Sequence, residues 1–419
     1  MSILNTSLSG MMANTNWLSS IAQNVANANT TGYKNVDTAF STLVDAGVDA
    51  DSEFAGVTTS VLNLNSLQGQ DMATSTTTDM SVQGAGFFIV SDASGDLFLT
   101  RNGSFVPDAS GNLVNSSGYY LMGTPYGQNS ASNALSSLEK INVNNGGTST
   151  IPSTTATMVA NLPSTATAVT GSTPASNLGA TATSTGSQYT AETSLVAYDD
   201  LGAPHTINYY FTKTGPDTWE ATAYDASTAS ATSTNGGFPY SSGPLATQTL
   251  TYSATTGALL TGGTMTMTVP SGKTLTVDLS QTTQLASAFA VSSATINGNA
   301  PGTVTDVSIA QDGTLSFTYG NGSVTPIYDI PLAKVASPDN MKSVVGDAFQ
   351  PDEQSGALQL GAAGTGGLGT INSSSLEQST VDLATELTAM VQAQADYQAN
   401  SKVFQAGAKL LDILNNLQT

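Results

Sequence analysis

The sequence predicts a mainly β protein with an α-helix at each end. Apolar residues recur at an interval of seven near the carboxyl terminus, and the same interval recurs near the amino terminus. Between the two ends, short apolar runs alternate with turns that contain Gly, Asn and Asp. We therefore expect the terminal helices to pair as a coiled coil, with two nested, discontinuous antiparallel β domains between them.

The carboxyl-terminal repeat begins at Leu376 and continues without a break to Leu411. A constant interval of seven predicts a helix that packs against another helix, although a core helix of a globular domain is the alternative. The other core column is polar or small at Gln394, Ser401 and Ala408, so the apolar stripe is narrow.

The amino-terminal repeat spans residues 4–29, and no charged residue occurs before Lys34. A short helix rich in Asn, Ser and Thr is marginal alone in water. We therefore expect both ends to become ordered by packing against other copies of the chain. The predicted polymerisation seam consists of Leu4, Leu8, Met11, Leu18, Val25, Leu383, Leu387, Met390, Tyr397, Phe404 and Leu411.

Composition excludes several classes of function. The chain has 419 residues, with 30 acidic and 9 basic side chains and a net charge of −21, which argues against nucleic acid and anionic membranes as partners. Cysteine is absent, so neither disulfides nor thiolate metal sites can form. We expect no cleavable signal peptide and no membrane insertion, because no apolar run has the required length and flanks.

Local signals predict the order of the elements. The first helix should end at Thr31-Gly32, where glycine can adopt a left-handed cap. A polar, weakly structured connector should follow to residue 78. Strands are then expected at 81–90, 97–101, 104–108, 112–123, 189–225, 248–253, 264–269, 274–279, 305–322 and 326–335. The Ser-, Thr- and Ala-rich tract at 148–188 should be loop or surface-strand material rather than core.

These elements predict five regions. They are a terminal helical domain (1–30 plus 373–419), a connector (31–78), an inner β domain (79–152 plus 303–365), an outer β domain (153–302) and a Gly-rich linker (366–372).

Residues with possible chemical roles favour a non-enzymatic protein. His205 is the single histidine and follows a turn, so neither a catalytic triad nor a zinc site is favoured. Gly364, Gly366 and Gly369 form a G-x-G-x-x-G, but no βαβ unit surrounds them, which favours a linker over a dinucleotide site. Asp199-Asp200 and Asp312-Gly313 are interpreted as turns. We predict no catalytic residue, metal or cofactor.

A secreted carbohydrate-binding module is a further alternative for a low-charge β protein. Aromatic residues of the outer domain could form its platform, but they alternate with small residues along strands, so burial in the core is favoured. They are Tyr209, Tyr210, Trp219 and Tyr240.

Several segments resemble the bacterial flagellar rod and hook proteins. NVANANTTGYK (24–34) is similar to their amino-terminal signature, DMSVQGAGFFIV (79–90) to the strand that opens their β domain, and residues 99–123 to the hairpin that follows. Residues 364–404 resemble their carboxyl-terminal helix. The matching signature residues are Asn24, Asn27, Asn29, Thr30, Gly32 and Tyr33.

Within this family, residues 195–225, 283–291 and 300–313 resemble segments of the hook members. Two positions depart from the family pattern: Ala395 stands where an arginine is usual, and Thr380 where an asparagine is common. The first departure removes any salt bridge of that arginine, but neither departure interrupts the seven-residue apolar line.

The resemblance implies a structural subunit that self-assembles into a curved hollow tube and passes torque from the rod to the filament as a flexible joint. A distal rod or other axial subunit is the alternative within the family. The implied partners are other copies of the chain, the distal rod protein, the hook cap, the hook–filament junction protein and the type III export apparatus. The implied location is the extracellular flagellum. As a separate hypothesis, the connector at 35–78 is our candidate for the element that tunes the stiffness of the tube.

Overall fold

The computed structural model describes residues 2–44, 54–127, 135–171, 173–176, 188–230 and 237–417. The chain divides into two compact units, each of which is described separately. Unit 1 consists of Met1–Gly146, Asp306–Thr318 and Val324–Thr419, and unit 2 of Gly147–Thr305 and Tyr319–Ser323.

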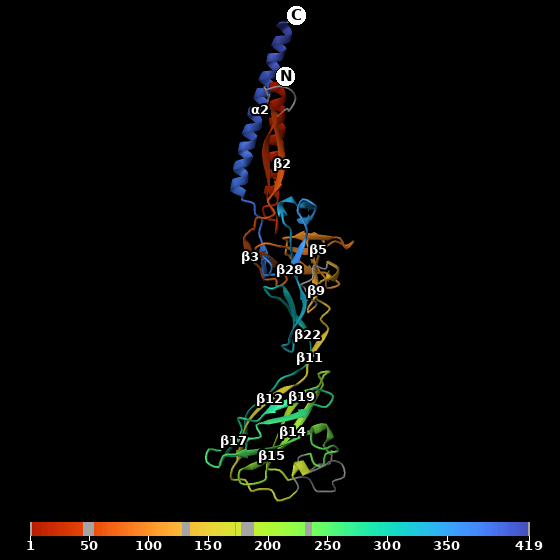
Figure 1. The fold of residues 1–419 in the computed structure, drawn as a ribbon, viewed down its shortest axis with the longest axis vertical. Coiled ribbons are helices and arrows are strands. Elements are labelled where there is room, and N and C mark those ends of the chain that lie inside the picture. The colour runs from red at the N-terminus through yellow and green to blue at the C-terminus, as the bar shows by residue number, and fades with distance from the viewer. Residues whose placement is uncertain are drawn as a thin grey trace. The chain divides into compact units, whose positions relative to one another are not determined.

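Unit 1 contains the two terminal helices, α1 (Ser2–Ala26) and α2 (Leu383–Leu417). They lie side by side and antiparallel, with the amino and carboxyl termini at the same end of the pair (Figure 1). The predicted fold class, mainly β with paired terminal helices, is confirmed.

Both helices are shorter than predicted at the ends that face the rest of the chain. α1 ends at Ala26 rather than at Gly32, because the Asn27 side chain donates to the carbonyl of Gln23 and turn hydrogen bonds replace the helical pattern. α2 begins only after Asp382, whose carboxylate caps it by accepting from the amide of Ala384 at 2.9 Å. Leu376, the predicted start of the seven-residue line, therefore lies in a strand, β30 (Ser375–Glu377).

The connector is not weakly structured, which corrects the prediction. It contains a hairpin of β1 (Val36–Val44) and β2 (Phe54–Asn63), which packs on α1, and a short strand β3 (Asp71–Ala73), which pairs with β30. Within residues 36–42 of β1 the one buried side chain is polar: the Thr38 hydroxyl donates to Ser20 of α1 at 2.9 Å. Residues 36–42 and 56–63 of the hairpin bury no apolar side chain, so hydrophobic periodicity could not reveal them.

The β structure of unit 1 is built around β5, which pairs with β6, β9 and β25. Two predicted strands are each split in two: residues 81–90 by Gly84 and Gly86, and 112–123 by a turn at Gly118. A core cluster contains Phe87, Ile89, Leu99 and Phe349. The remaining elements are β4 (Met80–Gln83), β5 (Phe87–Ser91), β6 (Leu97–Thr100), β7 (Phe105–Pro107), β8 (Leu113–Asn115), β9 (Tyr120–Pro125), η1 (Leu135–Ser137), β10 (Glu139–Lys140), β24 (Val324–Asp329), β25 (Pro331–Lys334), η4 (Pro338–Asn340), β26 (Lys342–Val344), β27 (Ala348–Gln350), β28 (Gln359–Ala362) and β29 (Thr370–Ser373).

Unit 2 is a sandwich of two five-stranded sheets whose facing side chains form one core. One sheet is an antiparallel meander in the order β13-β14-β15-β16-β17, and the other has the order β18-β19-β12-β20, with β21 also on β12. Its elements are β11 (Thr148–Ile151), β12 (Thr155–Pro163), η2 (Pro174–Ser176), β13 (Ala191–Tyr198), β14 (Pro204–Lys213), β15 (Thr218–Asp225), η3 (Ala226–Thr228), β16 (Ala246–Tyr252), β17 (Leu259–Thr261), β18 (Thr264–Thr268), β19 (Thr274–Asp278), β20 (Thr283–Leu285) and β21 (Ala290–Ile296). The chain passes between the units after Gly146, within β22 (Asn299–Ile309), within β23 (Thr314–Tyr319), and again before β24.

The predicted strands and turns of 189–225 are confirmed, and the four aromatic residues named as possible platform residues are at most 1 % exposed. The prediction for 148–188 is wrong at β12, because Met158 and Leu162 are fully buried in the core of the sandwich. Alternation of Thr with Ala and Met hid that apolar face. Residues 172 and 177–187 of the tract lie outside the described part of the chain.

Candidate functional site

The predicted polymerisation seam is divided between the helix pair and the surface. Six of its eleven residues are partly covered in the folded chain: Leu4, Met11, Leu18, Val25, Met390 and Phe404. The others are exposed: Leu8, Leu383, Leu387, Tyr397 and Leu411. The seven-residue line therefore marks one flank of the helix contact rather than its centre.

The centre of the contact on α2 is a different column, made of Glu386, Ala393, Asn400 and Gly407. Ala393 is fully buried, and a Cβ placed on Gly407 would lie 3.1 Å from a methyl group of Leu4. A Cβ placed on Gly10 of α1 would lie 2.9 Å from the Asn400 side chain. Small residues thus allow a close approach of the helices. These residues also recur every seven positions, but a search for large apolar residues does not find them because they are polar or small.

Asn24, near the carboxyl end of α1, connects α1 with β1 and α2 and is 1 % exposed. Its amide nitrogen donates to the carbonyl of Val36 at 2.8 Å and to Glu386 of α2 at 2.9 Å. Its oxygen accepts from the Val36 amide and from the Tyr33 hydroxyl. Because every polar atom of Asn24 is satisfied, a substitution there leaves several buried groups unpaired.

The other signature residues form the turn after α1. Asn27 accepts from the Thr30 hydroxyl at 3.2 Å, while Asn29 is exposed. Gly32 has φ +74°, and a Cβ at this position would lie 2.6 Å from the backbone nitrogen of Asn102. Only glycine therefore fits where this turn meets the β structure. Burial is the main cause that raises the pKa of the Tyr33 hydroxyl, with weaker effects of Asp347 and Glu386 in the same direction.

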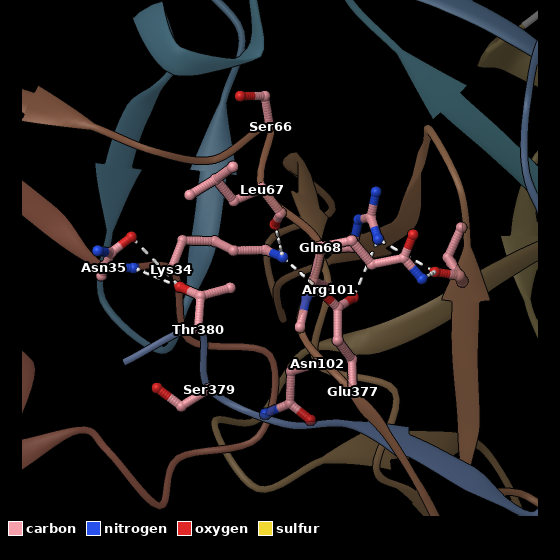
Figure 2. A network of polar contacts seen from close by, with 12 residues as sticks. Lys34, Asn35, Ser66, Leu67, Gln68, Arg101, Asn102, Glu377, Ser379 and Thr380 are labelled. Atoms are coloured by element: carbon pink, nitrogen blue, oxygen red, sulfur yellow. Dashed lines mark hydrogen bonds and ion pairs between the residues drawn. The ribbon is translucent and has the colours of Figure 1, made fainter. Parts of the chain in front are cut away.

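A buried ion-pair node joins segments from both ends of the chain to the β structure of unit 1. Glu377 is fully buried and pairs with Lys34 at 2.5 Å and with Arg101 at 2.9 Å. Figure 2 shows its carboxylate between the two cations. Arg101 also donates to the carbonyls of Val82 and Gly84.

The node holds two cations and one carboxylate, so its charges do not cancel. Burial is the largest influence on Lys34 and lowers the pKa of its ammonium; Glu377 opposes this effect, and Arg101 adds to it. The Arg101 guanidinium also lies 5.0 Å from the centre of the Phe87 ring, which contributes a cation–π interaction. Loss of Glu377 would leave both cations buried without a counter-ion.

Residues 65–69, which we name the clasp, follow the β1–β2 hairpin and connect it to the β structure of unit 1 through hydrogen bonds. Asn65 donates to the carbonyl of Pro338, and Ser66 donates twice to Asp339. The carbonyl of Leu67 accepts from Lys34 (Figure 2). Gln68 bonds the backbone of Val82 and Gly84, and the amide of Gly69 donates to Glu377 at 2.7 Å. Each of the five residues therefore makes a hydrogen bond that fixes the position of this segment.

Sequence reasoning did not predict the node or the clasp. Arg101 is the single arginine and Lys34 is the first charged residue, so both are conspicuous in the sequence. Their common partner Glu377, however, lies 276 residues after Arg101 and 343 residues after Lys34. Thr380, one of the departures from the family pattern, accepts from the amide of Asn35 at 2.9 Å, and Ala395, the other, is exposed.

The remaining candidate residues occupy turns. His205 lies 3.4 Å from Asp199, whose carboxylate also accepts from the amides of Leu201 and Ala203. In the described residues no three potential metal ligands cluster, and no helix is long and apolar enough to span a membrane.

The Gly-rich segment is not a flexible linker, which corrects the prediction for 366–372. Gly364 donates to the carbonyl of Gly369 at 2.7 Å, and the segment continues into β29, which pairs with β4. The G-x-G-x-x-G thus precedes a strand rather than a helix, so it lacks the context of a dinucleotide site.

Family models cover most of the chain. The flagella basal body rod protein model matches residues 4–34, and the flagellar hook protein FlgE/F/G D1 domain matches 81–161. The flagellar basal body protein FlaE D2 domain matches 161–299, and the flagellar basal body rod FlgEFG protein C-terminal model matches 372–417.

Relatives align along the whole chain. The flagellar hook protein FlgE of Brucella abortus biovar 1 is 39 % identical over 99 % of this chain and 98 % of its own length, and that of Rhizobium meliloti has the same identity and coverage. A crystal structure of Helicobacter pylori flagellar hook protein FlgE2 covers 73 % of this chain and 100 % of its own, with a TM-score of 0.45 at 15 % identity. The full-length identity with the Brucella and Rhizobium proteins shows that this chain belongs to the FlgE family of flagellar hook proteins.

Proposed function

We propose that this structural subunit of the flagellar hook polymerises through a surface made of α1, α2 and the β1–β2 hairpin, named the helical surface. The observation that carries the proposal is the apolar area that stays exposed after these elements have packed on one another. Ile3 and Met12 of α1 are 57 % and 59 % exposed, and Val391 of α2 is 68 % exposed. The other exposed large apolar residues of this surface are Leu8, Phe40, Val61, Leu62, Leu383, Leu387, Tyr397, Val403, Leu410, Leu411 and Ile413.

The exposed area is large enough to drive association. For a side chain that is already half covered, complete burial contributes about 1 kcal/mol. Even partial burial of this set in several neighbours therefore supplies about 10 kcal/mol per subunit before the entropic cost of association. An apolar surface of this extent is unusual on a protein that stays monomeric.

We further propose that unit 1 and unit 2 correspond to the inner and outer parts of a hollow tube that bends as it rotates. The polar strand surfaces of both units suit contacts that exchange during rotation, because charged residues make up only 9 % of the chain and ion pairs between subunits would seldom resist sliding. The family supports assembly of the chain with itself in the exported flagellum. Contacts with the distal rod, the cap, the junction protein and the type III apparatus, and export without a cleavable signal, belong to the same proposal.

The test is polymerisation of the purified full-length chain, measured by sedimentation and electron microscopy. Val391→Asp should raise the critical concentration by about 100-fold or more, because an aspartate buried at a subunit contact costs about 3 kcal/mol. Val345→Asp is the matched control, since Val345 is 90 % exposed on the turn between β26 and β27 and does not belong to the helical surface.

Circular dichroism of both variants as monomers verifies that their folds are retained. Polymerisation of Val391→Asp at the wild-type concentration would show that the helical surface does not carry assembly. An equal loss in Val345→Asp would contradict the assignment of assembly to this surface.

A further inference from the structure

We propose that Asp396 of one subunit forms an ion pair with a lysine of α2, Lys402 or Lys409, on the adjacent subunit, in a groove between α1, α2 and the β1–β2 hairpin. The inference rests on the proposed polymerisation through the helical surface and adds a defined contact to it. The chemistry of the groove, the distribution of charge and the geometry of α2 support it independently.

The groove has a volume of about 460 Å³ and combines a carboxylate with apolar walls. Asp396 lies in it beside Asn14 and Asn400, and Phe40 and Val57 form an apolar side. This lining suits a lysine side chain, whose methylene groups pack on apolar walls while the ammonium reaches a carboxylate and amide oxygens. Phe40 is 46 % exposed, and an aromatic ring in the lining also favours a cation.

Asp396 has acceptor capacity left for such a partner. Its two carboxylate oxygens accept from the Gln392 side chain at 3.2 and 3.3 Å, which are long distances for bonds to a charged group. The carboxylate is half-buried and has no ion pair within the described residues. A half-buried carboxylate gains more from a cation than one in open solvent.

Within the helical surface, the distribution of charge limits the possible partners to two residues. α1 and the β1–β2 hairpin contain no basic side chain, and α2 contains only Lys402 and Lys409. Both lysines are exposed, and neither has an ion-pair or hydrogen-bond partner in the part of the chain that the structure describes. They are seven residues apart, so they project from the same side of α2.

Helix geometry requires that the partner belong to another subunit. Lys402 follows Asp396 by six residues, which places the two side chains on different faces of α2. Lys409 is thirteen residues away, or about 20 Å along the helix axis. Because Asp396 lies in the groove and the lysines lie outside it, the contact joins two different patches, and repetition of such a contact produces an open helical polymer when its rotation does not close into a ring.

Charge reversal in the full-length chain tests the pair. Asp396→Lys should raise the critical concentration for polymerisation about tenfold or more, because it sets like charges opposite each other. Asp396→Asn, which keeps the shape, should have a smaller effect in the same direction. Asp412→Lys is the matched control, an identical charge change at an exposed position of the same helix, and should change the critical concentration less than threefold.

Reciprocal changes identify the lysine. Asp396→Lys combined with either Lys402→Asp or Lys409→Asp should restore the critical concentration to within about threefold of wild type for the true partner only. A 1:1 mixture of the two corresponding single variants should form copolymers at a concentration at which neither variant polymerises alone. In the mixture, opposite charges meet wherever a subunit of one variant contacts a subunit of the other, whereas each variant alone sets like charges opposite each other.

Two results would overturn the proposal: an unchanged critical concentration for Asp396→Lys with a folded monomer, or failure of both double variants and both mixtures to recover polymers. Either result leaves the wider proposal intact if Val391→Asp still abolishes assembly, so the two failures are distinguishable.

Discussion

Replacement of Glu377 by glutamine is the sharpest test of how the helical part of unit 1 is held to its β structure. The side chain keeps its size but loses its charge, so packing is unchanged and only the electrostatics of the node differ. Glu377 accepts from Lys34, from Arg101 and from the amide of Gly69.

The magnitude follows from counting these partners. A glutamine has one acceptor oxygen and one NH2 group, so at least one buried cation would face an N–H donor. Hydrogen bonds to charged groups contribute about 1.5 to 3 kcal/mol each. Removal of one member of a buried ion pair costs about 3 to 5 kcal/mol, because the remaining charge stays buried. We expect Glu377→Gln to lower the free energy of unfolding of unit 1 by about 3 to 5 kcal/mol.

Urea unfolding combined with peptide-resolved hydrogen exchange measures the effect and locates it. Protection should fall in residues 30–38, 64–84 and 370–382, while residues 189–225 of unit 2 should be unaffected and serve as an internal control. Glu353→Gln, an exposed change of the same chemistry, is the matched variant. A loss below about 1 kcal/mol, or a uniform loss in both units, would refute the reasoning.

Two further predictions concern the turn after α1 and the helix contact. Gly32→Ala should destabilise unit 1 by about 2 to 4 kcal/mol, since it combines a left-handed φ with a clash against the Asn102 backbone. Gly118→Ala, with a left-handed φ but open surroundings, should cost only about 1 to 2 kcal/mol in the same thermal melts. Glu386→Gln should stabilise the helix pair at neutral pH: burial is the main cause that raises the pKa of Glu386 above its ordinary value of 4.5, the hydrogen bond from Asn24 opposes this shift, and Asp37 and Asp382 add to it. Because the pKa is higher in the folded chain, the folded chain keeps the Glu386 carboxyl proton up to a higher pH than the unfolded chain does. The contribution of Glu386 to stability is therefore present at low pH and is lost as the pH rises above about 4.5. The difference in melting temperature between variant and wild type should therefore shrink from pH 7 to pH 4, and a difference independent of pH would contradict this assignment.

Sequence patterns predicted elements whose apolar side chains are large and regularly spaced. The line from Leu383 to Leu411 revealed α2, and alternation around Tyr209 and Trp219 revealed the meander of unit 2. The same method failed where burial depends on small or polar residues. Thr38 of the hairpin and Gly407 of the helix contact carry no hydrophobic signal, although both are buried.

The functional geometry was predictable only in part, for a related reason. The signature residues Asn24 and Gly32 could be located by resemblance, but their roles depend on contacts with Glu386 and Asn102, far away in the sequence. A single sequence contains no information that pairs Lys34 with Glu377, because neither spacing nor periodicity connects residues that meet only after the fold has closed.

That closure has a consequence for incomplete chains. Lys34 and Arg101 are made early in synthesis, and their shared counter-ion lies at residue 377, near the other end of the polypeptide. A chain truncated between residues 101 and 377 keeps both positive charges but lacks the carboxylate that neutralises them, so its amino-terminal segment loses this contact with the β structure. We therefore expect loss of the carboxyl-terminal segment to weaken the amino-terminal segment as well.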